Sequence, residues 1–260
     1  MAARKQRGAA PTRAQKRLAF IFAHPDDETF ATGGVIAKYA GQGVRVGLFC
    51  ATAGDAGRSS GIPVASRLEL GELRRNELLS AARFLGVSDL EIGNFGDGTL
   101  PTANSDELIG DIVFALRRWR PHVVVTFGPE GAPTGHADHA AISRAATAAF
   151  FLAGVATAFP AQLTEAQPIR PARLFYVAWR GEVTTKRGTF ASVAPTARID
   201  VRQQLREKMG AFLLHVTQRE HMSQFQELGM VKQEYYALAT GTPQRRPVID
   251  DLFDGLRVTR

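Results

Sequence analysis

The sequence predicts an α/β protein with a Rossmann-like, mostly parallel sheet flanked by helices. Two observations carry this prediction. Apolar segments of strand length alternate with helical patterns four times within residues 18–151, and such alternation specifies a parallel sheet covered on both faces. The apolar segments are also continuous, as expected of strands buried on both sides. Ligands of such folds bind beyond the carboxyl ends of the strands, so we expect a functional site there.

Each element of this region has its own local signal. Helical spacing is followed by Gly43 after the first helix and by Gly86 after the second, and the third ends before Pro121. A loop rich in Gly, Ser and Pro occupies residues 53–66. In chain order the sequence predicts strand 18–23, helix 28–42, strand 44–51, helix 67–85, strand 90–95, helix 106–119, strand 122–127 and helix 136–151.

The rest of the chain is less regular. A strand is predicted at 173–179, a helix at 201–221 and a strand at 234–239. The apolar, alanine-rich run 145–159 is expected to form a buried helix, because it is shorter than the roughly 18 apolar residues of a membrane span. We therefore expect no transmembrane segment.

The composition is that of an ordinary globular protein, with 45% hydrophobic and 22% charged residues among 260. The chain has a single cysteine, Cys50, which lies in an apolar run and is expected in the core. No intrachain disulfide can form, which favours a reducing, cytoplasmic location.

The net charge of +7 is concentrated at the N-terminus. Residues 1–17 contain six basic residues and no acidic one, so the remaining chain carries only +1. We interpret residues 1–17 as a disordered arm, with a weak anchor to anionic lipid or RNA as the alternative, and expect no specific nucleic-acid partner. No apolar stretch of a secretory signal follows it. One domain is expected at 18–241, and 242–260 form a polar tail with no predicted element.

Four ionisable residues follow the first predicted strand within five positions. The segment reads His24-Pro25-Asp26-Asp27-Glu28. Like charges this close repel one another. A divalent cation relieves that repulsion, because imidazole and carboxylate groups are its usual ligands.

A second cluster, Gly135-His136-Ala137-Asp138-His139, follows the fourth predicted strand. His136 and His139 are three residues apart, so they share a face of the first helical turn. Asp138 points elsewhere and is suited to hold an imidazole in one tautomer. Because both clusters follow strands of one sheet, the sequence predicts that they meet in a metal site.

A catalytic zinc ion takes three protein ligands and keeps one position for water. Two imidazoles and one carboxylate can be drawn from the two clusters. A remaining carboxylate would serve as general base, and the remaining imidazole would stabilise the tetrahedral intermediate. These considerations alone do not decide which aspartate binds the metal.

At these residues the sequence resembles the PIG-L/LmbE-like zinc deacetylases. The hallmarks are A-H-P-D-D-E after the first strand, here residues 23–28, and H-x-D-H after a later strand, here residues 136–139. The resemblance extends from about residue 18 to about residue 220. It implies hydrolysis of an N-acetylglucosamine-type or related small N-acyl substrate with a zinc ion, or with Fe²⁺ or Co²⁺, and a possible homo-oligomer.

The resemblance also implies individual roles. The zinc ligands would be His24, Asp27 and His139. Asp26 would be the general base, and His136, oriented by Asp138, would stabilise the oxyanion or act as general acid.

Two further residues, Arg74 and Asp97, match family positions that bind substrate hydroxyls. The alternatives are a surface ion pair between Arg74 and Glu77 and a turn at Asp97. Asp200, Lys208, His215 and Gln218 fit a later family-like pattern, in which His215 is either a core or subunit-contact residue or part of the site.

The two polar clusters are also compatible with function classes other than a deacetylase. An amidase for another N-acyl or thiol-conjugate substrate would use the same chemistry. A non-haem iron oxygenase also uses two histidines and a carboxylate, but Asp26 would then have no function. A nucleotide-binding module is disfavoured, because the first strand–helix turn lacks the glycine fingerprint and carries carboxylates that repel phosphate.

Overall fold

The computed structural model describes residues 15–131, 133–179, 181–185, 188–191 and 193–258. Seven strands form one sheet, in the spatial order β3 (Asp89–Phe95), β2 (Arg45–Thr52), β1 (Arg17–Phe22), β4 (Val123–Thr126), β5 (Arg173–Ala178), β9 (Gln233–Gly241) and β8 (Ala197–Asp200). The first five are parallel, and β9 and β8 complete the sheet in antiparallel pairings.

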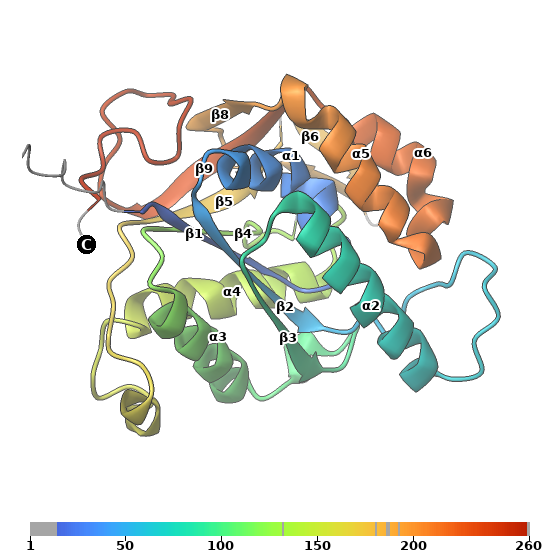
Figure 1. The fold of residues 1–260 in the computed structure, drawn as a ribbon, viewed down its shortest axis with the longest axis horizontal. Coiled ribbons are helices and arrows are strands. Elements are labelled where there is room, and N and C mark those ends of the chain that lie inside the picture. The colour runs from blue at the N-terminus through green and yellow to red at the C-terminus, as the bar shows by residue number, and fades with distance from the viewer. Residues whose placement is uncertain (1–14, 132, 180, 186–187, 192, 259–260) are drawn as a thin grey trace, which may run out of the picture.

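The helices cover both faces of the sheet (Figure 1). The longer helices are α1 (Asp27–Gly41), α2 (Arg67–Leu85), α3 (Ser105–Trp119), α4 (Ala137–Leu152) and α5 (Leu205–Leu214), and α6 (Met222–Gln224) is a single short turn. Helices α1, α2 and α5 pack together on one face, and α3 packs with α4 on the other. The predicted fold class, a mostly parallel sheet flanked by helices, is confirmed.

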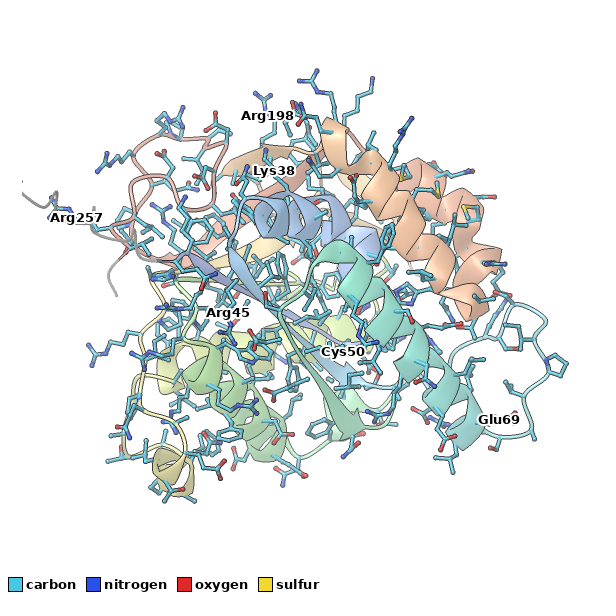
Figure 2. The ribbon with its side chains drawn as sticks, in the orientation of Figure 1. Lys38, Arg45, Cys50, Glu69, Arg198 and Arg257 are labelled. Atoms are coloured by element: carbon cyan, nitrogen blue, oxygen red, sulfur yellow. The ribbon has the colours of Figure 1, made fainter. Side chains whose placement is uncertain are left out.

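The centre of the sheet is β1, which pairs with β2 on one side and β4 on the other. Every residue from Leu18 to Phe22 is buried, because helices cover both faces of this strand. Phe22 pairs in register with Cys50 of β2. Cys50 lies among the interior side chains, as expected for a small core residue (Figure 2).

The bounds of α2 agree with the sequence prediction because its caps are encoded locally. Ser66 Oγ accepts a hydrogen bond from the amide of Glu69 at 3.2 Å, and Glu69 Oε2 accepts one from the amide of Ala65 at 2.6 Å. This reciprocal arrangement satisfies amides at the start of the helix. At the other end Gly86 adopts a φ of 84°, which favours glycine.

The antiparallel part of the fold contains strands that the sequence analysis did not predict. In β8, Ala197 and Ile199 are buried and Arg198 is exposed, an alternation too short to stand out in the sequence. A separate hairpin joins β6 (Glu182–Thr185) and β7 (Gly188–Ala191).

Two helix predictions were too long. The predicted helix 201–221 is divided into a 3₁₀ turn (Arg202–Gln204), α5 and a second 3₁₀ segment (Val216–His221), and the chain leaves helical geometry at His215. The apolar run 145–159 is helical only to Leu152. Beyond it the chain turns around the buried guanidinium of Arg117, which donates to the carbonyl groups of Ala153, Val155, Ala158 and Phe159.

The segment after β9 is packed against the sheet, although no element was predicted there. Ile249, Leu252 and Phe253 are buried in the core. The guanidinium of Arg173 donates to the carbonyl groups of Thr242, Pro243 and Leu252.

Most of the predicted arm 1–17 lies outside the described residues. Of its described part, Lys16 pairs with Asp251 at 3.3 Å, and Arg17 begins β1. Within the described ranges, none of the helices combines the length and apolar character that a membrane span requires.

Candidate metal centre

The site lies where the connections of the sheet change direction. Strands β1 and β4 are neighbours, but α1 follows β1 on one face and α4 follows β4 on the other. The carboxyl ends of two such strands leave a crevice between their connections. His24 and Asp27 come from the end of β1, and His136 and His139 from the start of α4.

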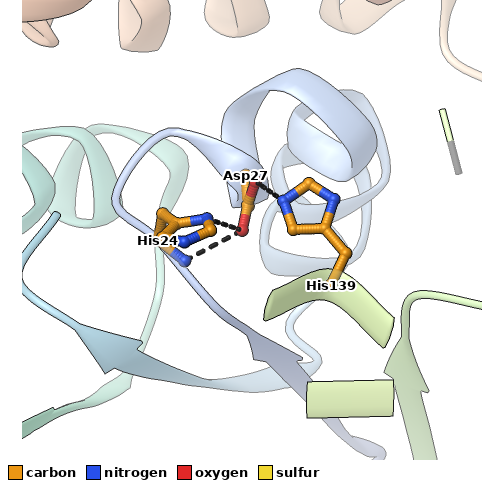
Figure 3. A group of neighbouring side chains, drawn as sticks. All are labelled: His24, Asp27 and His139. Carbon is orange, nitrogen blue, oxygen red and sulfur yellow. Dashed lines mark hydrogen bonds and ion pairs between the residues drawn. The ribbon is translucent and has the colours of Figure 1, made fainter. Parts of the chain in front are cut away.

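His24, Asp27 and His139 form a compact group of possible metal ligands (Figure 3). Oδ1 of Asp27 lies 3.2 Å from Nε2 of His139, and Oδ2 lies 3.5 Å from Nδ1 of His24. Each of the three residues offers one possible ligand atom, and these three atoms all lie within 4.8 Å of one another. All three side chains are buried, and two imidazoles with one carboxylate fit a divalent transition metal.

Asp27 is held by the backbone at the end of β1. Its Oδ2 accepts hydrogen bonds from the amides of Ala23 at 3.2 Å and His24 at 2.9 Å. Burial alone would raise the pKa of Asp27, but the charges and hydrogen bonds of His139 and His24 outweigh burial and hold it well below its usual range. Asp27 is therefore an ionised carboxylate, the form that binds a cation.

His24 is oriented by two other carboxylates. Its Nε2 lies 3.0 Å from Oδ2 of Asp138 and 3.1 Å from Oδ1 of Asp97, which directs Nδ1 toward Asp27. Burial alone would lower the pKa of His24, but hydrogen bonds with Asp138, Asp27 and Asp97 raise it well above its usual value. Metal-binding histidines are commonly held in this way by a carboxylate on the opposite ring nitrogen.

The fully buried Asp138 contacts more than one part of the site. Besides His24, its carboxylate accepts the amides of Gly98 at 2.7 Å and Leu100 at 3.2 Å. Burial would raise the pKa of Asp138, but the hydrogen bonds from His24 and Gly98 lower it. The sequence analysis expected Asp138 to orient His136, whereas these three bonds join its carboxylate to His24 and two backbone amides.

His136 is held by the backbone of α4. Its Nδ1 accepts a hydrogen bond from the amide of Asp138 at 3.2 Å, so His136 is the N-cap residue of the helix. In a neutral ring whose Nδ1 accepts, the proton is on Nε2. The ring lies 4.8 Å from that of His24 and lines the same cavity. Its geometry is suited to donating a hydrogen bond beside the candidate metal ligands.

Asp26 stands next to Asp27, one of the possible metal ligands, and lines the cavity. Its backbone has a φ of 97°, a left-handed conformation that is rare for any residue with a side chain. Burial, with the charge of Asp27, raises the pKa of Asp26 to about 6, although the nearby Arg74 opposes this shift. A carboxylate with a raised pKa beside a metal site is suited to accept and return a proton.

Arg74 and Asp97 also line this cavity. Nη1 of Arg74 donates to the carbonyl of Gly54 at 2.9 Å, and Nη2 donates to that of Pro25 at 2.6 Å. Oδ2 of Asp97 accepts the amide of Ala56 at 3.1 Å. Arg74 therefore anchors the loops around the site as well as facing the cavity.

Glu77, considered above as an ion-pair partner of Arg74, has other contacts. It accepts hydrogen bonds from the amide of Thr217 at 2.9 Å and from its hydroxyl at 2.6 Å. This attaches α2 to the 3₁₀ segment that follows α5.

The cavity has a volume of about 890 Å³. Its far wall includes polar residues that the sequence analysis did not select, namely Arg58, Glu220, His221, Gln224 and Glu227. Gln218, noted for its motif, also lines the wall and donates to the carbonyl of Arg58 at 3.1 Å. Arg58 belongs to the loop before α2, and the other four face the cavity only because the chain folds back after α5, so no local pattern marks them.

Two relatives from the genus Rhodococcus carry the same name. The 1D-myo-inositol 2-acetamido-2-deoxy-alpha-D-glucopyranoside deacetylase of Rhodococcus erythropolis is 33% identical over 80% of this chain and 82% of that protein. The protein of the same name from Rhodococcus jostii is 37% identical over 55% of this chain. That match spans only 56% of the Rhodococcus jostii protein.

Solved structures share the fold. A conserved protein from Thermus thermophilus is 26% identical with a TM-score of 0.68, over 88% of this chain and 97% of that one. The 4-carboxy-2-hydroxymuconate hydratase of Pseudomonas putida has a TM-score of 0.72 at 18% identity, over 89% of this chain and 99% of that one. This fold therefore occurs in an enzyme named as a hydratase, so the fold by itself does not define the reaction.

A family model assigns the chain more specifically. The PIG-L model, described as GlcNAc-PI de-N-acetylase, matches residues 19–150, which contain both motifs of the site. The match covers half of the chain, and the relative from Rhodococcus erythropolis extends the similarity over most of it. The resemblance seen in the sequence is thus confirmed, and the chain belongs to the PIG-L family.

Proposed function

We propose that this protein is a zinc-dependent N-deacetylase that hydrolyses the acetamido group of an N-acetylglucosamine-type or related small substrate. One observation carries the proposal. The group formed by His24, Asp27 and His139 opens into a cavity that Asp26 and His136 also line. Three metal ligands, a proton acceptor and a hydrogen-bond donor are what hydrolysis of an amide with an activated water requires.

Each residue has a distinct role in this proposal. His24, Asp27 and His139 would hold the zinc ion, which when bound would lower the pKa of water and polarise a carbonyl group. Asp26 accepts the proton of the attacking water and returns it to the leaving amine. Nε2 of His136 donates a hydrogen bond to the oxyanion of the tetrahedral intermediate and assists its collapse. Arg74 and Asp97 bind substrate hydroxyl groups.

The substrate class is supported by the names of the relatives and by the polar wall of the cavity. A sugar is bound through hydroxyl groups, which need charged and amide side chains such as Asp97 and Gln218. An amidase for another N-acyl or thiol-conjugate substrate is the alternative, and it would use the same centre with different contacts at this wall.

The remaining assignments rest on the sequence. We propose a catalytic domain at 18–241, with residues 1–17 as an arm and 242–260 as a tail, of which 242–258 pack on the domain. We also propose a cytoplasmic location, consistent with the lone Cys50, and a homo-oligomer. Zinc is the proposed metal, and Fe²⁺ and Co²⁺ suit the same donor set.

The test is an assay of amine release with and without metal. The full chain is stripped with a chelator, and each of Zn²⁺, Fe²⁺ and Co²⁺ is restored separately under argon and in air. The substrates are N-acetylglucosamine conjugates, including the inositol conjugate, beside other N-acyl compounds. We expect amine release to return with one equivalent of zinc and to be independent of oxygen. Oxygen-dependent turnover with Fe²⁺ alone, or turnover by the stripped protein, would contradict the proposal.

A further inference from the structure

A buried chain of hydrogen bonds runs from Asp26 through Glu28 to His215. The amide of Asp26 donates to Oε2 of Glu28 at 3.0 Å, and Oε1 of Glu28 lies 2.8 Å from Nε2 of His215. Glu28 is 1% exposed and His215 is fully buried. The contact joins the first turn of α1 to the end of α5, across 187 positions of sequence.

The backbone of Asp26 needs such support. A non-glycine residue in the left-handed region is strained and persists only where its surroundings hold it. Here three contacts restrain the peptide groups around Asp26. Its amide donates to Glu28, its carbonyl accepts the amide of Phe30 at 2.8 Å, and the carbonyl of Pro25 accepts Nη2 of Arg74 at 2.6 Å.

Glu28 in turn depends on His215. A buried carboxylate is costly unless its oxygens are paired. Oε1 of Glu28 accepts the hydroxyl of its neighbour Thr29 at 2.5 Å, but His215 is the contact that comes from another part of the fold. The histidine thus determines where the side chain of Glu28, and with it the amide of Asp26, is held.

His215 is an unusual residue for a purely structural contact. The chain departs from helical geometry at this position, with φ −82° and ψ 69°. Among the described residues, Nδ1 of His215 has no hydrogen-bond partner although it is buried. An unpaired buried nitrogen is costly, whereas Nε2 of the same ring pairs the buried carboxylate of Glu28. The bond to Glu28 therefore offsets the cost of burying the unpaired Nδ1 of His215.

We propose that Glu28 and His215 are positioning residues that hold Asp26 in its left-handed conformation and so keep its carboxylate facing the metal centre. The side chains lining the cavity, as far as the chain is described, include Asp26 but neither Glu28 nor His215. The two therefore act through Asp26 and not on the substrate. The effect on catalysis rests on the proposed role of Asp26 as general base, whereas the effect on its backbone does not.

The test compares three substitutions of His215. His215→Gln keeps a donor nitrogen at the place of Nε2, His215→Asn carries the same amide one methylene short of it, and His215→Phe removes the polar group. We expect kcat to fall about 100-fold in the Asn and Phe variants, since small misplacements of a catalytic group have effects of this size. KM and metal content should stay within twofold of wild type, and His215→Gln should recover most of kcat.

Tyr39→Phe is the matched control. It removes a buried hydroxyl that bonds Asp251 at 2.9 Å and the amide of Leu252 at 2.8 Å, away from the metal centre. We expect this variant to lower Tm without changing kcat. A loss of kcat in the His215 variants that merely followed the loss of stability would appear in this control as well.

A crystal structure of each soluble variant supplies the second readout. We expect φ of Asp26 to leave the left-handed region in His215→Asn and to stay near its present value in His215→Gln. Equal kcat for the Gln and Asn variants, or an unchanged Asp26 backbone in the Asn variant, would overturn the inference. If wild type shows no deacetylase activity, the proposed function fails, but the backbone comparison still decides the positioning role. If His215→Phe does not fold, the Gln and Asn pair decides alone.

Discussion

Nε2 of His24 lies 3.0 Å from Oδ2 of the fully buried Asp138. This contact leaves Nδ1 as the nitrogen that faces Asp27, so Asp138 sets which side of the imidazole is presented to a metal ion. The two residues come from different motifs, one after β1 and one at the start of α4. In the proposed metal centre, the second motif would therefore act through His139 and also through the orientation of His24.

Asp138→Asn should weaken metal binding, because an amide cannot keep all the acceptor contacts of the carboxylate. Loss of such outer contacts typically lowers metal affinity about 10–100-fold. The measurement is a zinc competition titration against a chromophoric chelator. Asp106→Asn, at an exposed position in the first turn of α3, is the control and should leave the affinity unchanged. An unchanged affinity in Asp138→Asn would show that the carboxylate does not orient His24.

Metal affinity should also depend on pH through His24. Its pKa in the metal-free protein is raised well above that of an ordinary histidine, and only the neutral ring binds metal. Zinc binding should therefore release a proton at neutral pH, and affinity should fall as the pH is lowered through the raised pKa of His24. Calorimetry in two buffers of different ionisation enthalpy measures the proton release. Zinc uptake without proton release at pH 7 would contradict the raised pKa.

The stability of the metal-free protein should depend on the ionisation of Asp26. The folded pKa of about 6 exceeds the value of about 3.9 expected in the unfolded chain. The unfolded state therefore binds fewer protons between these pH values, and wild-type stability falls as the pH rises from 4 to 6. Asp26→Asn removes the group that ionises, so the fall in stability between pH 4 and 6 should disappear. The substitution suits the backbone, because asparagine tolerates the left-handed conformation.

Asp26→Asn should consequently raise the Tm of metal-free protein at pH 7.5, with the difference from wild type vanishing near pH 4. Thermal denaturation across this pH range is the measurement. A constant difference at every pH would mean that ionisation of Asp26 is not its source.

The segment after β9 should contribute substantially to stability. Leu252 is fully buried and Val248 is 48% exposed. Leu252→Ala should lower the free energy of unfolding by about 2–5 kcal/mol, because it removes buried methyl groups and leaves a cavity. Val248→Ala should change it by no more than about 0.5 kcal/mol. Urea denaturation measures the free energy of unfolding of both variants. A similarly small loss in Leu252→Ala and Val248→Ala would show that this segment is not part of the cooperative core.

The first half of the fold could be predicted because its signals are local. The buried run ending at Phe22 and the capped helix α2 are recognisable within a few residues. The polar clusters at His24 and His136 follow such strands, so their meeting follows from the topology of a parallel sheet. The topology did not predict which atoms of the two clusters are in contact. The contact between Asp138 and His24 depends on the loop that carries Gly98, whose amide also bonds Asp138.

The second half depends on contacts between distant residues. The helical pattern of 201–221 is continuous in the sequence, yet the chain breaks at His215, whose partner Glu28 lies in α1. The contact of Arg173 with the carbonyl of Leu252 also joins residues far apart in the sequence, 79 positions from one another. The far wall of the cavity, with Glu220 and His221, is placed by this part of the chain and so could not be identified beforehand.

Asp26 is the residue on which the proposed function most depends, as the proton acceptor beside a bound metal. The most direct test is the rate of amine release from an N-acetylglucosamine conjugate by zinc-loaded Asp26→Asn, beside wild type of equal metal content. General-base catalysis contributes about 10²–10⁴-fold, so we expect the variant to retain its zinc and to lose activity by that factor. A fully loaded variant that releases amine within a fewfold of the wild-type rate would contradict the account.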